Sequence, residues 1–141
     1  MRAVGVVGRG DAESDEAFEV GRLLAERGAV VVTGGLGGVM ASAARGAASA
    51  GGLVVGLLPG LDRSAANEWV SVAIPTGLGE LRNGLVVRAS DALIAVGGGY
   101  GTLSEIALAL KAGKPVVGIG SWEIEGVVAA SGAADAVARV T

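Results

Sequence analysis

Short apolar runs recur along the chain and alternate with longer segments in which apolar and polar residues are mixed. The apolar runs predict strands at 3–7, 29–32, 53–57, 69–74, 92–96 and 115–119, and they indicate a seventh strand at 127–130. Most of these runs are continuous rather than alternating. That pattern is typical of a parallel sheet that is covered on both faces.

The segments between the strands predict helices at 11–27, 39–50, 80–89 and 102–112, followed by a short closing helix. Gly28 ends the first of these helices, and Gly51 and Gly52 end the second. Strands that alternate with helices form βαβ units with right-handed crossovers. The predicted fold class is therefore α/β. We expect a single-domain, Rossmann-like, doubly wound sheet over residues 1–141, mostly parallel, with about six or seven strands and helices on both faces.

Composition fits a tightly packed aliphatic core with many glycine turns. Hydrophobic residues make up 51% of the chain, but aromatic residues make up only 3%, so the core must consist of Ala, Val, Leu and Ile. Glycine accounts for 26 of 141 residues, far above the usual share of ~7%. The glycines cluster between the apolar runs, which predicts that they form turns and loops.

Charge and missing residue types exclude several classes of protein. The net charge of −3 comes with no long basic run, so we expect no nucleic acid partner. The chain has no Cys and no His, which excludes disulfides, the Ser-His-Asp triad and the common zinc sites, and we predict no metal site. No uncharged apolar stretch reaches the ~18 residues of a membrane span. With no signal peptide visible at the start, the expected location is cytoplasmic and no membrane partner is expected.

Two glycine loops carry the candidate binding chemistry. Residues 34–38 follow the second strand and residues 97–101 follow the fifth, and each loop leads directly into a predicted helix. The start of a helix offers unpaired N–H groups and a positive dipole end, which favour phosphate. The alternative is that these glycines only make tight turns. The candidate ligand-binding residues are Gly34, Gly35, Gly37, Gly38, Gly98, Gly99, Tyr100, Gly101, Thr102 and Arg9.

Two standard nucleotide signatures are absent. The first turn, Gly8-Arg9-Gly10-Asp11-Ala12-Glu13, lacks the third glycine of G-x-G-x-x-G, and no acidic residue follows the second strand at Thr33-Gly34. No G-x-x-x-x-G-K-[ST] motif is present either. A dinucleotide dehydrogenase and a Walker-type ATPase are therefore not indicated.

The second glycine loop resembles the signature of the LONELY GUY superfamily, P-G-G-x-G-T-x-x-E. That superfamily includes cytokinin-activating phosphoribohydrolases, DNA-processing protein A and molybdenum cofactor carrier proteins. Residues 97–105 read Gly-Gly-Gly-Tyr-Gly-Thr-Leu-Ser-Glu, so only the leading Pro is replaced, by Gly97. Residues 33–40 and 90–96 are also similar to the family, and the resemblance covers most of the chain.

The resemblance implies catalytic roles for two residues. Arg82 matches the family's catalytic Arg and Glu105 its catalytic Glu, and Asn83 stands in place of the Lys of the motif R-K-x-x-M. The residues also allow simpler interpretations. Arg82 fits a solvated helix charge, and Thr102 and Glu105 have the spacing of a capping box. The departures from the enzyme motifs resemble the carrier-protein branch.

The leading hypothesis is a binding or carrier protein for a phosphorylated small molecule, with a nucleoside monophosphate or a molybdopterin-type cofactor as the bound ligand. Its rival is a phosphoribohydrolase that cleaves nucleoside 5′-monophosphates to base and ribose 5-phosphate, and a third class is a nucleotide sensor without turnover. Tyr100 could stack on a base or a pterin, or could simply lie at the rim. The resemblance also implies a homodimer or a dimer of dimers, with the helix around Arg82 near the interface.

Overall fold

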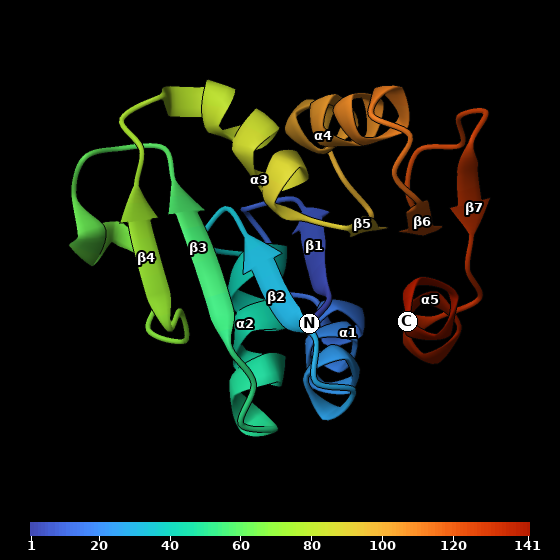
Figure 1. Ribbon diagram of the computed structural model, residues 1–141, viewed down its shortest axis with the longest axis horizontal. Coiled ribbons are helices and arrows are strands. Elements are labelled where there is room, and N and C mark those ends of the chain that lie inside the picture. The colour runs from blue at the N-terminus through green and yellow to red at the C-terminus, as the bar shows by residue number, and fades with distance from the viewer.

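A single parallel sheet organises the molecule. The computed structural model describes residues 1–141 and holds a 7-stranded sheet in the order β4-β3-β2-β1-β5-β6-β7 (Figure 1). All neighbouring strands pair in parallel. This confirms the α/β class and the doubly wound, parallel sheet expected from the continuous apolar runs. The strands are β1 (Ala3–Gly8), β2 (Val30–Thr33), β3 (Val54–Leu58), β4 (Val72–Pro75), β5 (Ala92–Val96), β6 (Val116–Ile119) and β7 (Val127–Ala129).

Helices cover both faces of the sheet. Three of them pack on one face and two on the other, and in Figure 1 the pair α3 and α4 lies above the sheet. The first layer consists of α1 (Asp15–Glu26), α2 (Val39–Ser49) and α5 (Ala133–Val140), and the second of α3 (Asn83–Ala89) and α4 (Tyr100–Lys111). Two short 3₁₀ segments, η1 (Arg63–Ala65) and η2 (Gly79–Arg82), lie beside β4 in the sequence. None of the helices combines the length and the apolar character needed to cross a membrane.

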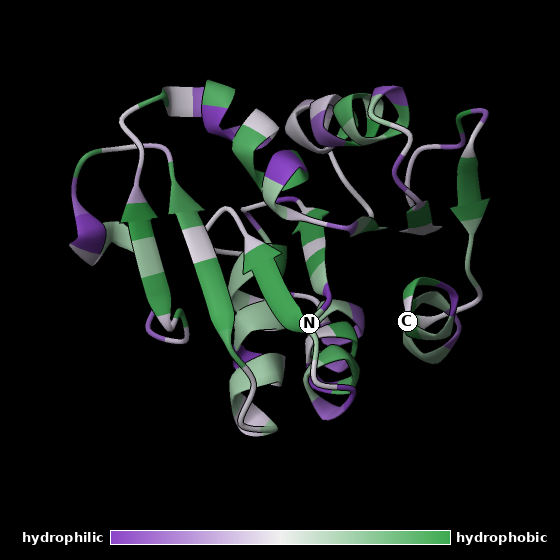
Figure 2. Ribbon diagram, in the orientation of Figure 1, coloured by the Kyte–Doolittle hydropathy of each residue, from purple (hydrophilic) through white to green (hydrophobic).

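The core is aliphatic on both sides of the sheet, as the composition predicts. The larger cluster joins strand residues such as Val4 and Ile94 to the alanines of α1 and α2, including Ala17 and Ala43. The smaller cluster lies under α3 and α4. Hydropathy colouring shows apolar strands throughout, whereas the helices carry hydrophilic positions along their lengths (Figure 2). The five inner strands are buried along almost their whole length, which explains why their sequences do not alternate, whereas the edge strands β4 and β7 are partly exposed.

Several predicted boundaries differ from the structure, and local hydrogen bonds explain two of the differences. Helix α1 begins at Asp15 rather than at residue 11, because the Ser14 side chain caps it by accepting from the Ala17 amide. Strand β4 begins at Val72 rather than at residue 69, because a turn closed by Asn67 holds the preceding residues. Helix α4 begins at Tyr100 rather than at residue 102.

Candidate functional site

The strand order creates a crevice between β1 and β5. The chain proceeds outward from β1 to β4, and then β5 returns to the other side of β1 and continues outward to β7. In open α/β sheets, ligands bind beyond the carboxyl ends of the strands at such a reversal. The loops that follow β1 and β5 therefore flank the expected position of a ligand.

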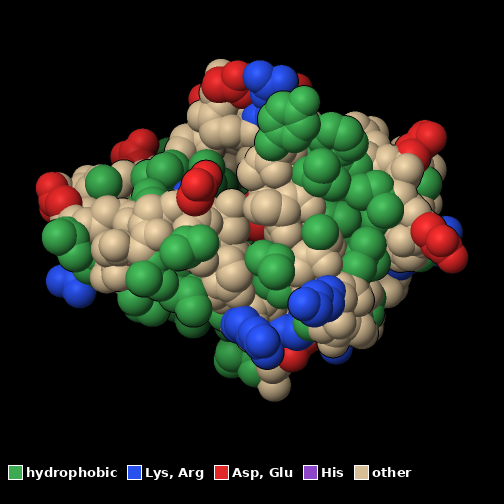
Figure 3. Space-filling view, turned by 90° about the horizontal axis from the view of Figure 1, so that it is seen from above, with side chains coloured by type: hydrophobic (Ala, Val, Ile, Leu, Met, Phe, Trp, Pro, Cys, Tyr) green, Lys and Arg blue, Asp and Glu red, His purple; other side chains and the backbone are tan.

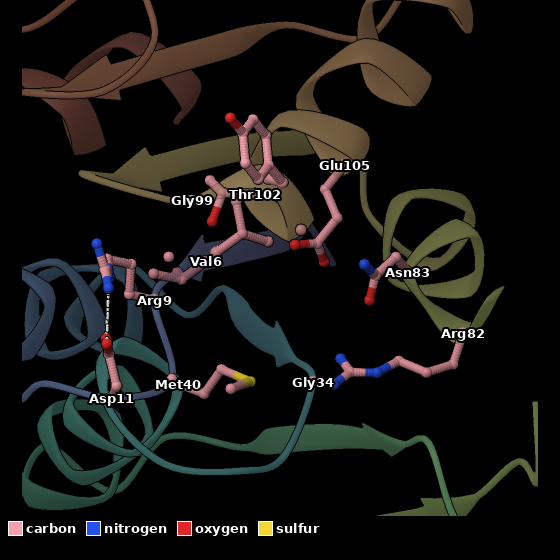
Figure 4. Close-up of a pocket in the computed structure, with 15 residues that line it drawn as sticks. Val6, Arg9, Asp11, Gly34, Met40, Arg82, Asn83, Gly99, Thr102 and Glu105 are labelled. Atoms are coloured by element: carbon pink, nitrogen blue, oxygen red, sulfur yellow. Dashed lines mark hydrogen bonds and ion pairs between the residues drawn. The ribbon is translucent and has the colours of Figure 1, made fainter. Parts of the chain in front are cut away.

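A cavity of about 650 Å³ lies at this position (Figure 4). Its size is within the range of ~300–1,000 Å³ that is usual for small-molecule sites. Its wall comes from four parts of the chain: the end of β1, the loop after β2 with the first turn of α2, the junction of η2 and α3, and the start of α4. The lining residues are Val6, Val7, Gly8, Arg9, Gly10, Asp11, Gly34, Met40, Arg82, Asn83, Gly99, Tyr100, Gly101, Thr102 and Glu105.

The start of α4 presents open amides to this cavity. Gly99 is the N-cap residue and supplies no side-chain cap, and no acidic residue occupies the first turn. The first hydrogen bond of the helix runs from the Leu103 amide to the Gly99 carbonyl. The amides of Tyr100, Gly101 and Thr102 therefore have no partner within the helix. Together with the positive end of the helix dipole, they suit an anion.

Arg82 reaches the cavity from the end of η2 and is 9% exposed. Its Nε has no hydrogen-bond partner, and none of the ion pairs of the chain involves it. Gly34 makes room for its guanidinium, because a Cβ at residue 34 would overlap Nη1 of Arg82. A buried, unpaired cation is costly for a protein on its own. The arrangement therefore favours a site that a negatively charged ligand completes.

Glu105 lies opposite Arg82, on the buried face of α4, and is 7% exposed (Figure 4). Burial raises the pKa of Glu105 to about 8, although the nearby charge of Arg82 acts in the opposite direction. Burial likewise lowers the pKa of Arg82, and Glu105 opposes that shift. Because a guanidinium still keeps its proton at neutral pH, the mostly protonated carboxyl group leaves the positive charge of Arg82 uncompensated.

Arg9 stands at the mouth of the cavity and is paired with Asp11 in the same loop. The guanidinium donates two hydrogen bonds to the carboxylate, at 3.0 and 2.7 Å (Figure 4). These hydrogen bonds lower the pKa of Asp11. Both side chains are largely exposed, so the pair is weak and can exchange for other partners.

The structure brings most of the candidate residues of the sequence analysis together. Arg82 and Glu105 line the cavity, and so do Gly34, Gly99, Tyr100, Gly101, Thr102 and Arg9. The other candidates, Gly35, Gly37, Gly38 and Gly98, are not among the residues that line the cavity. Gly38 serves as the N-cap of α2, where a Cβ would collide with the backbone of Arg9.

Both simpler interpretations of the central pair are wrong. Arg82 is not a solvated helix charge, since it is buried. Thr102 and Glu105 form no capping box, because Gly99 is the N-cap of α4 and Thr102 lies within its first turn. The buried residues of α4 are Thr102, Glu105, Ile106 and Ala109, which share one helical face. That spacing was the signal in the sequence for the inward direction of Glu105.

Part of the cavity wall comes from residues that were not predicted from the sequence. Gly8 and Gly10 line the cavity at the end of β1, although their segment fails the dinucleotide motif. Their place at the carboxyl end of the first strand could have indicated this role. Asn83, which stands in place of the Lys of the enzyme motif, also lines the cavity, and its side-chain amide donates to the Ser104 hydroxyl at 3.3 Å. Met40 had no signal in the sequence.

Known proteins are similar to this chain in sequence. A protein of Archaeoglobus fulgidus is 50% identical over 122 residues, which cover 84% of this chain and 80% of that protein. The cytokinin riboside 5′-monophosphate phosphoribohydrolase LOG of Oryza sativa subsp. japonica is 37% identical over 103 residues, or 70% of this chain. The match covers 42% of the rice enzyme, so the chain spans well under half of its length.

Solved structures are similar over nearly the whole chain. The molybdenum cofactor binding protein of Rippkaea orientalis has a TM-score of 0.92 and 36% identity, and the match covers 99% of this chain and 94% of that one. The molybdenum cofactor carrier protein of Chlamydomonas reinhardtii has a TM-score of 0.89 and 37% identity, with 99% and 96% covered. A structure of DNA processing protein A of Helicobacter pylori, described with its single-stranded DNA binding mode, has a TM-score of 0.65 and 25% identity, with 90% and 68% covered.

Sheet order, crevice and glycine loop together define a Rossmann-like protein of the superfamily that holds the LONELY GUY enzymes, DNA-processing protein A and the molybdenum cofactor carriers, on the carrier-like branch. Within that superfamily, residues 1–140 match the SLOG cluster4 family. The chain belongs to this family.

Proposed function

We propose that residues 1–141 form one domain that binds a phosphorylated small molecule, either a nucleoside monophosphate or a molybdopterin-type cofactor, as a binding or carrier protein. The phosphate rests on the open amides of Tyr100, Gly101 and Thr102, and Arg82 contacts the ligand from the opposite wall. One observation carries the proposal: Arg82 is buried without a partner in a cavity that an uncapped helix also faces.

The electrostatics of the cavity support an anionic ligand. Glu105 is mostly protonated at neutral pH, so Arg82 and the dipole of α4 leave the interior positive. A phosphate supplies acceptors both for a guanidinium and for backbone amides. By their names, the protein of R. orientalis binds the molybdenum cofactor and the rice enzyme acts on a riboside 5′-monophosphate, and both kinds of ligand agree with the proposal.

Calorimetric titration of the protein with AMP tests the proposal. We expect Arg82→Ala to weaken AMP binding at least tenfold, since a hydrogen bond to a charged group contributes about 1.5–3 kcal/mol. Arg88→Ala is the matched control, because Arg88 is exposed on the neighbouring helix α3. Removal of an unpaired buried charge should not lower the melting temperature of the empty protein. Equal affinities of the unaltered chain and of Arg82→Ala would contradict the proposal.

The second candidate function is hydrolysis of the N-glycosidic bond, and the juxtaposition of Arg82 and Glu105 favours it. Water would add to the sugar carbon, and the base would leave with a proton, giving ribose 5-phosphate. An ionised carboxylate stabilises the oxocarbenium-like sugar best, yet Glu105 is mostly protonated at neutral pH. Asn83 also lacks the positive charge of the Lys in the enzyme motif. Turnover is therefore expected to be weak or absent.

A base-release assay with a panel of nucleoside monophosphates separates the two candidates. The control is the double variant Arg82→Ala, Glu105→Ala. Release by the unaltered chain at about 1 s⁻¹ or faster, lost in the double variant, would put the enzyme ahead of the carrier. Mass spectrometry of whatever co-purifies with the native protein would identify the ligand of a carrier.

We also propose a homodimer or a dimer of dimers that uses the outer side of α3 and α4. Figure 3 shows the molecule from this side, and hydrophobic side chains form several patches on the surface seen there. Leu81 is 74% exposed, and Leu85 and Leu108 beside it are also exposed. Apolar side chains grouped in this way are typical of interfaces. Light scattering at micromolar concentration would contradict the proposal if it gave the mass of a monomer.

A further inference from the structure

Two aromatic side chains form a stacked pair beside the cavity. The ring centroids of Tyr100 and Trp122 are 6.1 Å apart, with 30° between the ring planes. Tyr100 lines the cavity, and Trp122 follows β6 in the sequence. The whole chain has only 2 Trp, 1 Tyr and 1 Phe. Half of its aromatic residues are therefore concentrated at one edge of the candidate site.

The position of Tyr100 is not explained by packing within the chain. Its side chain is 84% exposed, although it stands in the first turn of α4, next to the open amides. Trp122, by contrast, is partly buried against the smaller core cluster. Its indole Nε1 donates to the Gly99 carbonyl at 3.1 Å. Trp122 thus joins the glycine loop to the core, and its ring lies stacked beside the exposed ring of Tyr100.

This arrangement places a flat apolar surface next to a seat for phosphate. Tyr100 contributes both, since its amide belongs to the open first turn of α4 and its ring lies at the rim of the same cavity. A tyrosine side chain has only two rotatable χ angles, so it loses little conformational freedom when a ligand stacks on it. Stacking of a heterocyclic base on an aromatic side chain is worth about tenfold or more in affinity.

We propose that Tyr100, stacked beside Trp122, holds the planar nitrogen heterocycle of the ligand, so that this one side chain sets the preference of the site for heterocyclic phosphates over simple sugar phosphates. This inference rests on the proposed function and adds the residue that recognises the ring of the ligand. Tyr100 contacts the ring directly, and Trp122 is a positioning residue. The hydroxyl of Tyr100 has no part in the interaction.

The test compares three ligands: AMP, a phosphorylated pterin and ribose 5-phosphate. The protein carries Trp69→Phe, which leaves Trp122 as the only tryptophan and as a fluorescent reporter. Trp69 lies in the turn before β4 and does not line the cavity. We expect AMP or the pterin to change the Trp122 emission on binding and ribose 5-phosphate to leave it nearly unchanged. Of AMP and the pterin, the one that binds more tightly and changes the Trp122 emission more is the better model of the natural ligand.

Substitutions at the pair supply the decisive comparison. Tyr100→Ala should weaken the heterocyclic ligand about tenfold and ribose 5-phosphate by less than about twofold. Tyr100→Phe should retain the affinity, and Trp122→Ala should weaken the same ligand less than Tyr100→Ala does. Folding is not at risk at residue 100, because the side chain is exposed and alanine favours helices.

The outcomes separate this inference from the proposed function. Equal losses for AMP and ribose 5-phosphate in Tyr100→Ala, or no loss for either, would overturn the heterocycle seat while phosphate binding stands. A tenfold loss in Tyr100→Phe would also overturn it, because the hydroxyl would then carry the interaction. Failure of the unaltered chain to bind any of the three ligands would overturn the proposed function, and this inference with it.

Discussion

Helices α1 and α4 begin in opposite ways, although each has 12 residues and each follows one of two adjacent strands, β1 and β5. Side chains at the start of α1 satisfy its free amides and its dipole. The Ser14 hydroxyl accepts a hydrogen bond from the Ala17 amide, and Asp15 and Glu16 place negative charge at the positive end of the helix dipole. The start of α4 has Gly99 as its N-cap, without a side-chain cap, and no acidic residue in its first turn.

The difference shows which helix terminus the fold leaves available to a ligand. Residues 9–14 separate β1 from α1, whereas only residues 97–99 separate β5 from α4. The short connection holds the start of α4 at the crevice, and the longer one lets α1 begin away from the cavity wall. A capped terminus contributes to stability by itself, while an uncapped one reserves its amides for an external anion.

The largest combined effect, on folding and on ligand binding together, is expected from Gly97→Pro, which would break the short connection to α4. Gly97 has a φ of 58°, and its amide donates to the Ile119 carbonyl at 3.0 Å. Proline fixes φ near −65° and has no amide hydrogen. We expect a loss of about 3 kcal/mol or more in unfolding free energy, measured by urea denaturation, and loss of AMP binding.

Gly97→Ala is the matched control for this substitution. Its amide is retained and a Cβ meets no atom within 4 Å, so only the positive φ is penalised, by about 1–2 kcal/mol. The family signature has proline at this position. Gly97 has a positive φ, a backbone conformation that proline cannot adopt. Equal stability of Gly97→Pro and the unaltered chain would contradict this interpretation.

The sequence predicted the parallel strands better than it predicted where the helices begin. Continuous apolar runs such as 92–96 gave the parallel strands directly, because burial on both faces leaves no polar alternation. Helix starts were harder, since both Asp11 and Ser14 can act as caps and only the tertiary position of the loop decides between them. The Thr102–Glu105 spacing matched a capping box, and the burial of Glu105 in the crevice overrode it.

The candidate site was predictable in its glycines and much less so in its charges. A glycine loop between a strand and a helix is a local signal, and Gly99 and Gly101 carry it. Burial of Arg82 depends on the packing of η2 against the loop after β2, where Gly34 leaves space for the guanidinium. No local pattern encodes a contact between residues so distant in sequence. The residue types alone therefore could not show that Arg82 lacks a partner.

The second effect concerns the acidic residues of the two helices. Those of α1 are in its first turn, whereas Glu105 of α4 is buried and has a pKa raised from 4.5 to about 8. Between these values the folded chain keeps a proton that the unfolded chain loses. This contribution to stability is complete below pH 4.5 and is lost as the pH rises through 8. Unfolding free energy should fall by up to about 1.4 kcal/mol per pH unit in that window.

Glu105→Gln should flatten this dependence, because an amide does not titrate. Glu16→Gln, at the exposed start of α1, is the control and should retain the slope of the unaltered chain. Urea denaturation at pH 5, 6.5 and 8 checks both variants. If Glu105→Gln kept the full slope, another group would be responsible for it.

A smaller effect is expected from Ser14→Ala, which opens the start of α1. The lost hydrogen bond, from the Ala17 amide to the Ser14 hydroxyl at 3.1 Å, should lower the unfolding free energy by about 1 kcal/mol. AMP affinity should not change, because Ser14 does not line the cavity. Urea denaturation and calorimetric titration give the two values. A weaker affinity would show that the capped terminus is coupled to the site after all.

The smallest change in folding free energy is expected from Gly99→Asp, which would give α4 the kind of start that α1 has. Gly99 has φ −107° and ψ −155°, an extended conformation that aspartate adopts without strain, and a Cβ there meets nothing within 4 Å. The new carboxylate can cap the open amides. We expect a gain of a few tenths of a kcal/mol and at least a tenfold loss of AMP affinity, because the carboxylate occupies the phosphate position and repels the phosphate.

Gly99→Ser separates the two causes of that loss. Serine caps the helix without adding charge, so it should stabilise the fold by a similar amount but weaken AMP less than aspartate does. The difference should shrink as salt is added, since screening acts on the repulsion and leaves the cap in place. Titrations of both variants at two salt concentrations measure it. If Gly99→Asp bound AMP as tightly as the unaltered chain, the open start of α4 would not be the phosphate seat.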